Sequence, residues 1–186
     1  ELNNVTSDKA IALLNDGKLN NVTITEDGGV YGLWITADGQ TVDVDGLDIT
    51  ATNGGRGIAI KDQYVDSPAC VTLNVKNATF ETAEKAAILV TSNEGAVITL
   101  EDVDITNVAA DSDFAVWVDK ARAAYADKVV VNGGLCKVEG ATASVAETLE
   151  ELKAGLATEN ATVYLKPTED GKSLELGGKI SIAKGA

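Results

Sequence analysis

Apolar and polar positions alternate along the chain in short runs that recur. The string LNNVT occurs twice, at residues 2–6 and 19–23. A looser frame follows, in which an apolar residue precedes two turn-forming residues and then an apolar, a polar and an apolar residue. Its copies begin at Leu19, Val44, Val75, Leu100 and Val131, and the last copy is degenerate. Alternation with a period of two predicts β-strands, and a recurring frame predicts a repeat architecture.

Two further apolar runs accompany each copy of the frame. One follows it, at residues 33–35, 58–60, 88–90 and 116–118. The other precedes it, at residues 42–44, 71–73, 98–100 and 129–131. Three short strands per repeat are typical of a coil wound from parallel sheets, and such coils must stack to share a core.

The second turn-forming position of the frame is restricted in residue type. Its residues are Asn21, Gly46, Asn77, Asp102 and Gly133. Asn, Asp and Gly are the residues that tolerate a left-handed backbone. The column therefore predicts a two-residue bend whose second residue has a positive φ.

With this column the chain resembles the right-handed parallel β-helix of the pectate-lyase-like superfamily, over about residues 2–138. Members of that family carry such a turn between their second and third sheets, often with stacked asparagines. The resemblance implies an all-β fold, namely a single-stranded solenoid of five or six coils. The chain matches no enzyme signature of the family. A leucine-rich repeat and an antiparallel sandwich are alternatives, but the first needs a stricter frame and the second does not explain the column.

The segment Ser7–Asn15 is ambiguous. Ser7 is a suitable cap for a short helix. Alternatively, residues 11–13 form the strand equivalent to residues 33–35, because the LNNVT string precedes both. We favour the strand.

The pattern changes after Gly140, which predicts coils over residues 1–140 and a different piece over 141–186. Ser144 and Glu147 have the spacing of a capping box that opens a helix through about Ala157. Its buried stripe would be Val145, Leu149, Leu152 and Leu156. Strands are predicted at 161–165, 174–176 and 180–182, with a hairpin turn at Asp170-Gly171. We expect the helix and the β-hairpin to cap the coils; the alternative is the start of a second module.

Composition narrows the function classes. The chain has 186 residues, 15 Lys and Arg, 29 Asp and Glu, a net charge of −14 and no His. This acidity argues against nucleic-acid binding, and the lack of His excludes His-dependent triads and His-ligated zinc. No apolar run is long enough for membrane insertion. The acidic, Thr-, Asn- and Gly-rich composition is typical of a bacterial secreted or cell-surface protein, and a chain without Met is expected to be a piece of a longer one.

The two cysteines, Cys70 and Cys136, are too few for a disulfide framework. They either pair or act as two small buried hydrophobic residues, and we favour the second interpretation.

The apolar runs that follow each copy of the frame, at residues 33–35, 58–60, 88–90 and 116–118, carry the candidate site. Their outward column is Trp34, Ala59, Leu89 and Trp117, and the next outward position is Thr36, Lys61, Thr91 and Asp119. Enzymes of the resembled family carry their active site on this sheet, yet these columns lack clustered carboxylates. We therefore expect a non-catalytic binding or structural module, adhesin-like or carbohydrate-binding, that uses Trp34, Leu89, Trp117, Lys61 and Asp119. The alternative is that loops, or the segment Asp119–Lys128, bury both tryptophans.

The expected partner is a glycan or another surface protein, and the sequence sets no oligomeric state. A second function class is the remnant of a polysaccharide lyase or glycoside hydrolase with loop-borne groups. The candidates for it are Lys61, Asp62, Asp119, Lys120 and Arg122. We expect no cofactor and no metal, since the run Asp43–Asp48 lacks the spacing of a calcium loop. The remaining carboxylates are predicted to form a solvated face: Asp43, Asp45, Asp48, Glu101, Asp102, Asp104, Asp111 and Asp113.

Overall fold

The computed structural model describes residues 1–28, 31–53, 55–82, 86–106, 113–165 and 184. The chain divides into two compact units, Glu1–Glu139 and Gly140–Ala186. The predicted strands at 174–176 and 180–182, the turn at Asp170-Gly171 and the carboxylate of Asp111 lie outside the described residues. None of the helices in the described ranges is both long and apolar enough to span a membrane.

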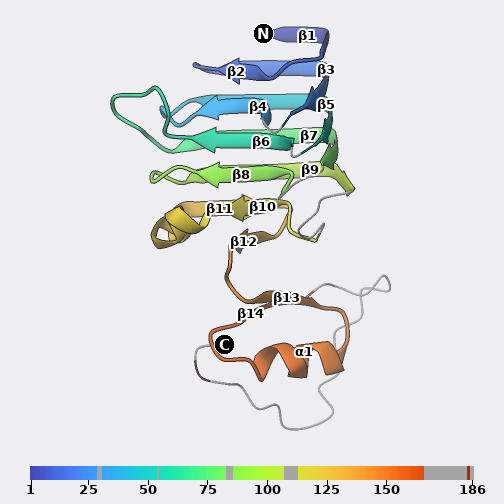
Figure 1. Cartoon of the computed structure of the whole chain (residues 1–186), viewed down its shortest axis with the longest axis vertical. Helices are drawn as coiled ribbons and strands as arrows, with labels where there is room; N and C mark the ends of the chain where they lie inside the picture. The colour runs from blue at the N-terminus through green and yellow to red at the C-terminus, as the bar shows by residue number, and fades with distance from the viewer. Residues whose placement is uncertain (29–30, 54, 83–85, 107–112, 166–183, 185–186) are drawn as a thin grey trace. The chain divides into compact units, whose positions relative to one another are not determined.

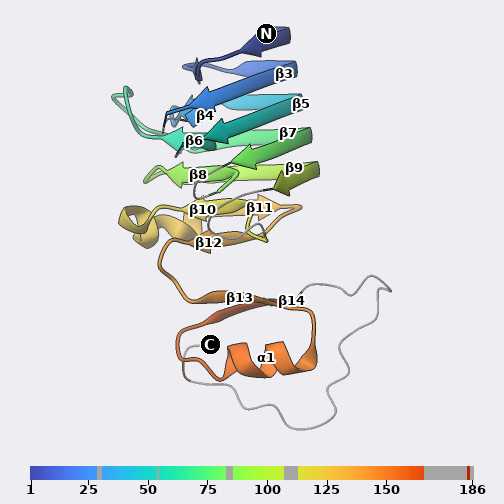
Figure 2. The ribbon, with the colours of Figure 1, turned by 45° about the vertical axis from the view of Figure 1, so that its right-hand side comes forward.

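The first unit consists of two six-stranded parallel sheets between which the chain alternates (Figures 1 and 2). One sheet contains β1 (Leu2–Ser7), β3 (Gly17–Asp27), β5 (Thr41–Thr52), β7 (Val71–Thr82), β9 (Ala96–Thr106) and β11 (Val129–Asn132). The other contains β2 (Ile11–Leu13), β4 (Tyr31–Thr36), β6 (Arg56–Lys61), β8 (Ile88–Thr91), β10 (Val116–Val118) and β12 (Cys136–Val138). Within each sheet the strands follow chain order. The prediction of an all-β unit with parallel sheets is confirmed, and the antiparallel sandwich is wrong.

The long strands of the first sheet bend at the predicted turn column. The φ angles are 51° at Asn21, 77° at Gly46, 51° at Asn77, 52° at Asp102 and 80° at Gly133. The pairing of β3 with β5 skips Asn21 and Gly46 and resumes beyond them. The left-handed conformation is therefore as predicted. At the first four of these positions, the two strands predicted on either side of the bend are, however, parts of one long strand, because the ladder continues on both sides of the skipped residue. At Gly133 the strand ends before the bend.

Strand β2 settles the ambiguous segment. Ile11 pairs with Leu33 and Leu13 pairs with Ile35 in parallel register. The strand interpretation is confirmed and the helix alternative is wrong. The duplicated LNNVT string is the reason, since Leu2 pairs with Leu19 in the neighbouring sheet.

The apolar core collects the inward side chains of both sheets. Its largest fully buried members include Leu19, Leu33, Ile35, Leu47, Ile58, Ile60, Leu73 and Phe80. Because parallel register places equivalent residues one above the other, each strand extends the same apolar columns. A fully buried Leu, Ile or Phe contributes about 1.5–3 kcal/mol relative to exposure, so the repeated columns account for the stability of the stack.

The second unit contains β13 (Ala143–Ala146), α1 (Leu149–Leu156) and β14 (Thr162–Leu165), and its two strands pair in parallel. The capping box is formed by Thr148 and Glu151. The predicted box at Ser144 and Glu147 is wrong, because Ser144 pairs with Val163 in the ladder. The same Ser/Thr-x-x-Glu spacing recurs at Thr148, and the helix begins there. Of the predicted stripe, Leu152 is buried on α1 while Val145 belongs to β13.

Cys70 and Cys136 are not joined by a disulfide bond. Cys70 is exposed, so the prediction that it is a buried hydrophobic residue is wrong. Cys136 is partly buried in β12, and this burial raises the pKa of its thiol to about 11. A thiol with such a pKa stays protonated and unreactive near neutral pH.

Candidate binding surface

The predicted outward column lies on one face of the sheet that contains β2 to β12. Trp34, Ala59, Leu89 and Trp117 are in register across β4, β6, β8 and β10. Ala59 is 0%, Leu89 1% and Trp117 8% exposed, whereas Trp34 is half-buried. The column is therefore not a continuous exposed strip, and of the two tryptophans only Trp117 is buried. Alternation along a strand predicts the direction of a side chain but not what packs over it.

Trp117 belongs to a packed cluster. The Nζ atom of Lys137 lies 5.2 Å from the centre of the Trp117 ring and 4.9 Å from that of Phe114. Phe114 is itself fully buried. A cation held between two aromatic faces stabilises the packing of both rings. Trp117 and Leu89 are thus structural residues of this face.

Trp34 has a different environment. The ring of Tyr64, from the loop after β6, lies 5.4 Å from the Trp34 ring at an interplanar angle of 47°. The Nζ atom of Lys61 lies 5.2 Å from the Trp34 ring and 5.0 Å from the Tyr31 ring. Arg56 donates a hydrogen bond of 3.0 Å to the Tyr31 hydroxyl. We call Tyr31, Trp34, Lys61 and Tyr64 the Trp34 surface.

Tyr64 is the unusual member of this surface. It is 76% exposed, yet its φ angle is 66°. A bulky residue in the left-handed region costs about 1–2 kcal/mol and persists only where its surroundings hold it. Sequence reasoning missed Tyr31 and Tyr64; the pairing of Tyr31 with Arg56 follows from the repeat, but no sequence signal predicts the backbone of Tyr64.

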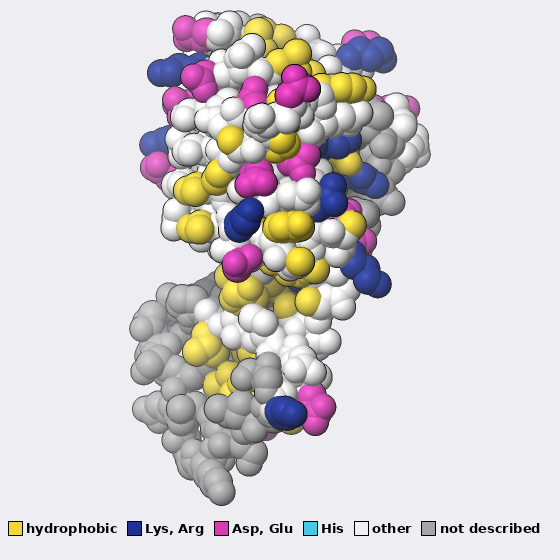
Figure 3. Space-filling model, turned by 90° about the vertical axis from the view of Figure 1, so that its left-hand side faces the viewer, with side chains coloured by type: hydrophobic (Ala, Val, Ile, Leu, Met, Phe, Trp, Pro, Cys, Tyr) yellow, Lys and Arg dark blue, Asp and Glu magenta, His cyan; other side chains and the backbone are white. Residues whose placement is uncertain are grey.

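A cavity of about 340 Å³ adjoins the Trp34 surface at Lys61. Its lining is Lys61, Asp62, Gln63, Thr91 and Arg122. The loop after β6 and the 3-10 helix η1 (Lys120–Lys128) lie on the same side of the unit, where β6 and β8 end (Figure 1). Figure 3 looks onto this side and shows Lys and Arg side chains beside hydrophobic ones. We call this the Arg122 cavity.

Hydrogen bonds fix the walls of the Arg122 cavity. The Nε atom of Arg122 donates to the Thr91 carbonyl oxygen at 3.0 Å. One carboxylate oxygen of Asp62, Oδ2, accepts from the Asn93 backbone N–H at 2.8 Å. The other, Oδ1, is buried and has no hydrogen-bond partner. Lys61 pairs with Thr91 between β6 and β8, so the ends of these two strands lie side by side. The hydrogen bond from Arg122 attaches η1 to the same place.

The structure thus gathers three of the five residues considered for catalysis, Lys61, Asp62 and Arg122. The other two are elsewhere. Asp119 caps η1, where its Oδ1 accepts from the Ala121 N–H at 2.8 Å, and it does not line the cavity. Lys120 is exposed and does not line the cavity.

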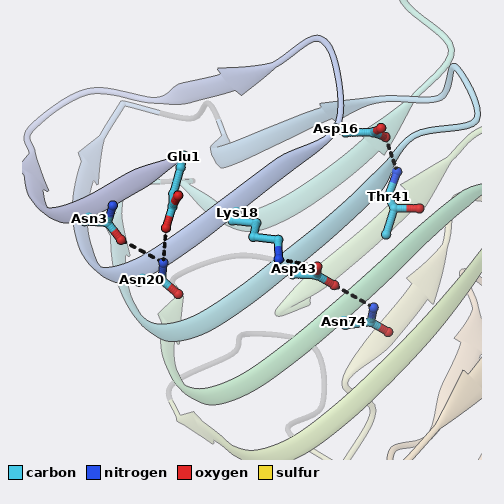
Figure 4. Close-up of polar contacts among 8 residues, drawn as sticks. All are labelled: Glu1, Asn3, Asp16, Lys18, Asn20, Thr41, Asp43 and Asn74. Atoms are coloured by element: carbon cyan, nitrogen blue, oxygen red, sulfur yellow. Dashed lines mark hydrogen bonds and ion pairs between the residues drawn. The ribbon is translucent and has the colours of Figure 1, made fainter.

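A second polar region lies on the outer side of β1, β3, β5, β7 and β9, and we call it the polar ladder (Figure 4). Seven of its members line a groove of about 300 Å³: Lys18, Asn20, Asp43, Asp45, Asn74, Lys76 and Glu101. The eighth member, Asn3, is hydrogen-bonded to Asn20. Members hydrogen-bond or pair with one another along the stack. Asn20 donates to Asn3 Oδ1 at 2.7 Å, and Asn74 donates to Asp43 Oδ1 at 2.9 Å.

Charged members of the polar ladder are also paired. The Nζ atom of Lys18 lies 4.0 Å from Asp43 Oδ2, and that of Lys76 lies 2.9 Å from Glu101 Oε1. The hydrogen bond and the charge of Glu101 raise the pKa of Lys76. The predicted solvated face is confirmed for the exposed carboxylates Asp45, Asp48, Glu101, Asp102, Asp104 and Asp113. Asp45 and Glu101 also accept hydrogen bonds from Asn77 and Lys76, and of the described carboxylates in this set only Asp43 is partly buried. Asp48 and Asp104 lie two strands apart, as the repeat requires.

The side chains in the described ranges form no cluster of three or more metal-ligating residues. Comparison with known proteins adds no candidate relative. No family model matches the chain, and neither a curated protein nor a solved structure matches it. The Trp34 surface and the Arg122 cavity are the regions whose chemistry indicates a function.

Proposed function

We propose that the first unit is a right-handed parallel β-helix that serves as a non-catalytic carbohydrate-binding module of a secreted or surface-exposed bacterial protein. The alternation of the chain between two parallel sheets and the left-handed turn column support the β-helix. The observation that carries the binding role is the Trp34 surface, where an exposed, strained Tyr64 is held against a half-buried Trp34.

The chemistry of this surface suits a sugar. Aromatic rings offer flat apolar faces against which the C–H face of a pyranose packs, while tyrosine hydroxyls and Lys61 donate to sugar hydroxyls. Stable protein partners bury about 800 Å² on each side, far more than three rings supply. Energetic cost concentrated at an exposed residue is typical of functional sites, and Tyr64 has such a backbone.

Glycan-array binding at neutral pH, followed by titration calorimetry, tests the proposal. Tyr64→Asn removes the ring and keeps a residue that tolerates positive φ, so the fold is preserved. We expect it to weaken binding at least about tenfold, equal to about 1.4 kcal/mol. Tyr125→Asn is the matched control, because Tyr125 is also exposed and also contacts a lysine. Equal binding by wild type and Tyr64→Asn would overturn the proposal.

One observation favours a second candidate, a polysaccharide-cleaving activity: Lys61, Asp62 and Arg122 line a single cavity. Asp62 is the one carboxylate among the described lining residues, whereas glycoside hydrolysis uses a pair. Release of reducing or unsaturated sugars from an array ligand, abolished by Lys61→Ala, would establish this activity in place of simple binding.

A further inference from the structure

The cations of the Arg122 cavity differ from three other lysines of the first unit. Lys18, Lys76 and Lys128 each lie within 4.0 Å of a carboxylate, from Asp43, Glu101 and Glu94 respectively. Among the described residues, neither Lys61 nor Arg122 has an acidic group within that distance. Lys120 and Lys137 also have no such partner among the described residues, but only Lys61 and Arg122 share the lining of this cavity. Two cations without ion pairs that face one cavity create a local positive potential in a protein whose net charge is −14.

We propose that the Arg122 cavity is a subsite for a singly charged anionic substituent, a carboxylate or a sulfate, of the ligand that packs on the Trp34 surface. This inference rests on the proposed carbohydrate-binding function and makes the ligand an acidic glycan. Lys61 connects the two sites, because it lines the cavity while its Nζ lies about 5 Å from the rings of Tyr31 and Trp34.

The position of Arg122 suits a planar anion. Its Nε–H is engaged by the Thr91 carbonyl, which fixes the guanidinium against the end of β8. The four N–H donors of the two terminal nitrogens then remain for a ligand, in the fork geometry that carboxylates and sulfates accept in bidentate fashion. Pre-fixing the guanidinium also lowers the entropy lost on binding.

Asp62 limits the charge of the ligand. Its carboxylate lines the same cavity as Lys61 and Arg122, so the three side chains together carry a formal charge of +1. A ligand group with one negative charge neutralises it. A second charge, as on a phosphate monoester, would be repelled by Asp62. The buried Oδ1 of Asp62 lacks a donor, and a ligand hydroxyl beside the anionic group would supply one.

The size of the cavity fits the same ligand. Its volume of about 340 Å³ is at the lower end of small-molecule sites, enough for one sugar residue with its substituent. The rest of an oligosaccharide would then extend over Trp34 and Tyr64.

Calorimetry with matched ligands tests the proposal: a neutral oligosaccharide, its uronate counterpart and its sulfated counterpart. Wild type is expected to bind one or both acidic ligands at least about tenfold more tightly than the neutral one, with a preference that shrinks as salt rises. The uronate and sulfate arms identify which group is recognised. Arg122→Gln is expected to abolish the preference for acidic ligands, so that the neutral, uronate and sulfated ligands bind the variant with about equal affinity. Lys120→Gln, a cation of the same 3-10 helix outside the cavity, should change neither.

Failure of this proposal is distinct from failure of the proposed function. Equal affinity of wild type for neutral and acidic ligands, or an acidic preference that survives Arg122→Gln, overturns the anion subsite while carbohydrate binding stands. If no oligosaccharide binds, titration with free glucuronate and free glucose, followed by NMR at the Arg122 Nε–H and the Asn93 amide, decides the subsite alone. Shifts with glucuronate only would support it, and no shift with either would overturn it.

Discussion

The polar ladder and the Arg122 cavity are both built from polar side chains at the surface of parallel sheets, yet their chemistry differs. In the polar ladder, partners come from adjacent strands about 4.8 Å apart, so Asp43 meets Asn74 directly. In the Arg122 cavity, the side chains come from a strand end, a loop and η1. These segments leave a space of about 340 Å³ among them.

This difference shows how a stacked parallel fold separates stability from binding. In-register side chains of the polar ladder hydrogen-bond to one another across adjacent strands. Where the chain leaves a β-strand, as it does after Lys61, side chains are fixed by hydrogen bonds to the backbone and keep donors and acceptors without partners. Variants of the ladder should therefore change stability alone, and variants of the cavity should change binding alone.

The largest effect on the ladder is expected from Gly46→Val. Gly46 has a φ of 77°, and a Cβ there would lie 2.7 Å from Asn21 Oδ1. A β-branched residue in this conformation should lower the free energy of unfolding by about 2–4 kcal/mol, measured by chemical denaturation. Gly46→Asn is the control, since Asn21 and Asn77 adopt the same backbone in adjacent strands. A valine variant as stable as the asparagine variant would contradict the steric explanation of the turn column.

A smaller effect is expected from Asp43→Ala, which removes the acceptor for Asn74 and the partner of Lys18. The loss in unfolding free energy should be about 1 kcal/mol. Ligand affinity should stay at the wild-type value. Asp48→Ala, an exposed position of the same strand, should be neutral. If Asp43→Ala weakened binding as much as Arg122→Gln, the separation between ladder and cavity would fail.

The smallest effect concerns Lys76 and pH. Glu101 raises the pKa of Lys76 above its ordinary value of 10.5. The folded protein therefore holds this proton more tightly than the unfolded chain does. The pair's contribution to stability is complete below pH 10.5 and is lost as the pH rises through the folded-state pKa. Lys76→Gln should flatten the decline of unfolding free energy above pH 10, and an unchanged slope would show that the pair contributes nothing.

The sequence predicted the features that depend on local rules. A positive φ selects Asn, Asp and Gly, so the turn column was visible without the structure. The duplicated LNNVT string identified β2 because the parallel register copies equivalent residues from strand to strand. The parallel pairing of the strands was predicted from the same repeated frame.

Long-range packing was beyond the sequence. The capping box was misplaced because two successive Ser/Thr-x-x-Glu patterns, at residues 144–147 and 148–151, are locally equivalent, and the pairing of Ser144 with β14 decides between them. The burial of Leu89, which is 1% exposed, does not follow from the alternation of residues along its strand. The cavity joins Lys61, Thr91 and Arg122, and the register aligns Lys61 with Thr91, but only the fold of η1 places Arg122 beside them.

The nearest-neighbour pairing of the strands has a consequence for dynamics. Strands β1 and β2 have a partner on one side only, and the apolar side chains Leu2, Val5, Ile11 and Leu13 that they contribute are partly exposed. Fraying should start at such ends and be slowest in β5 to β8, whose neighbours lie on both sides. Amide exchange should therefore be slowest in the strands that supply Lys61 and Thr91. The scaffold of the Arg122 cavity is in this way insulated from opening at the margins of the stack.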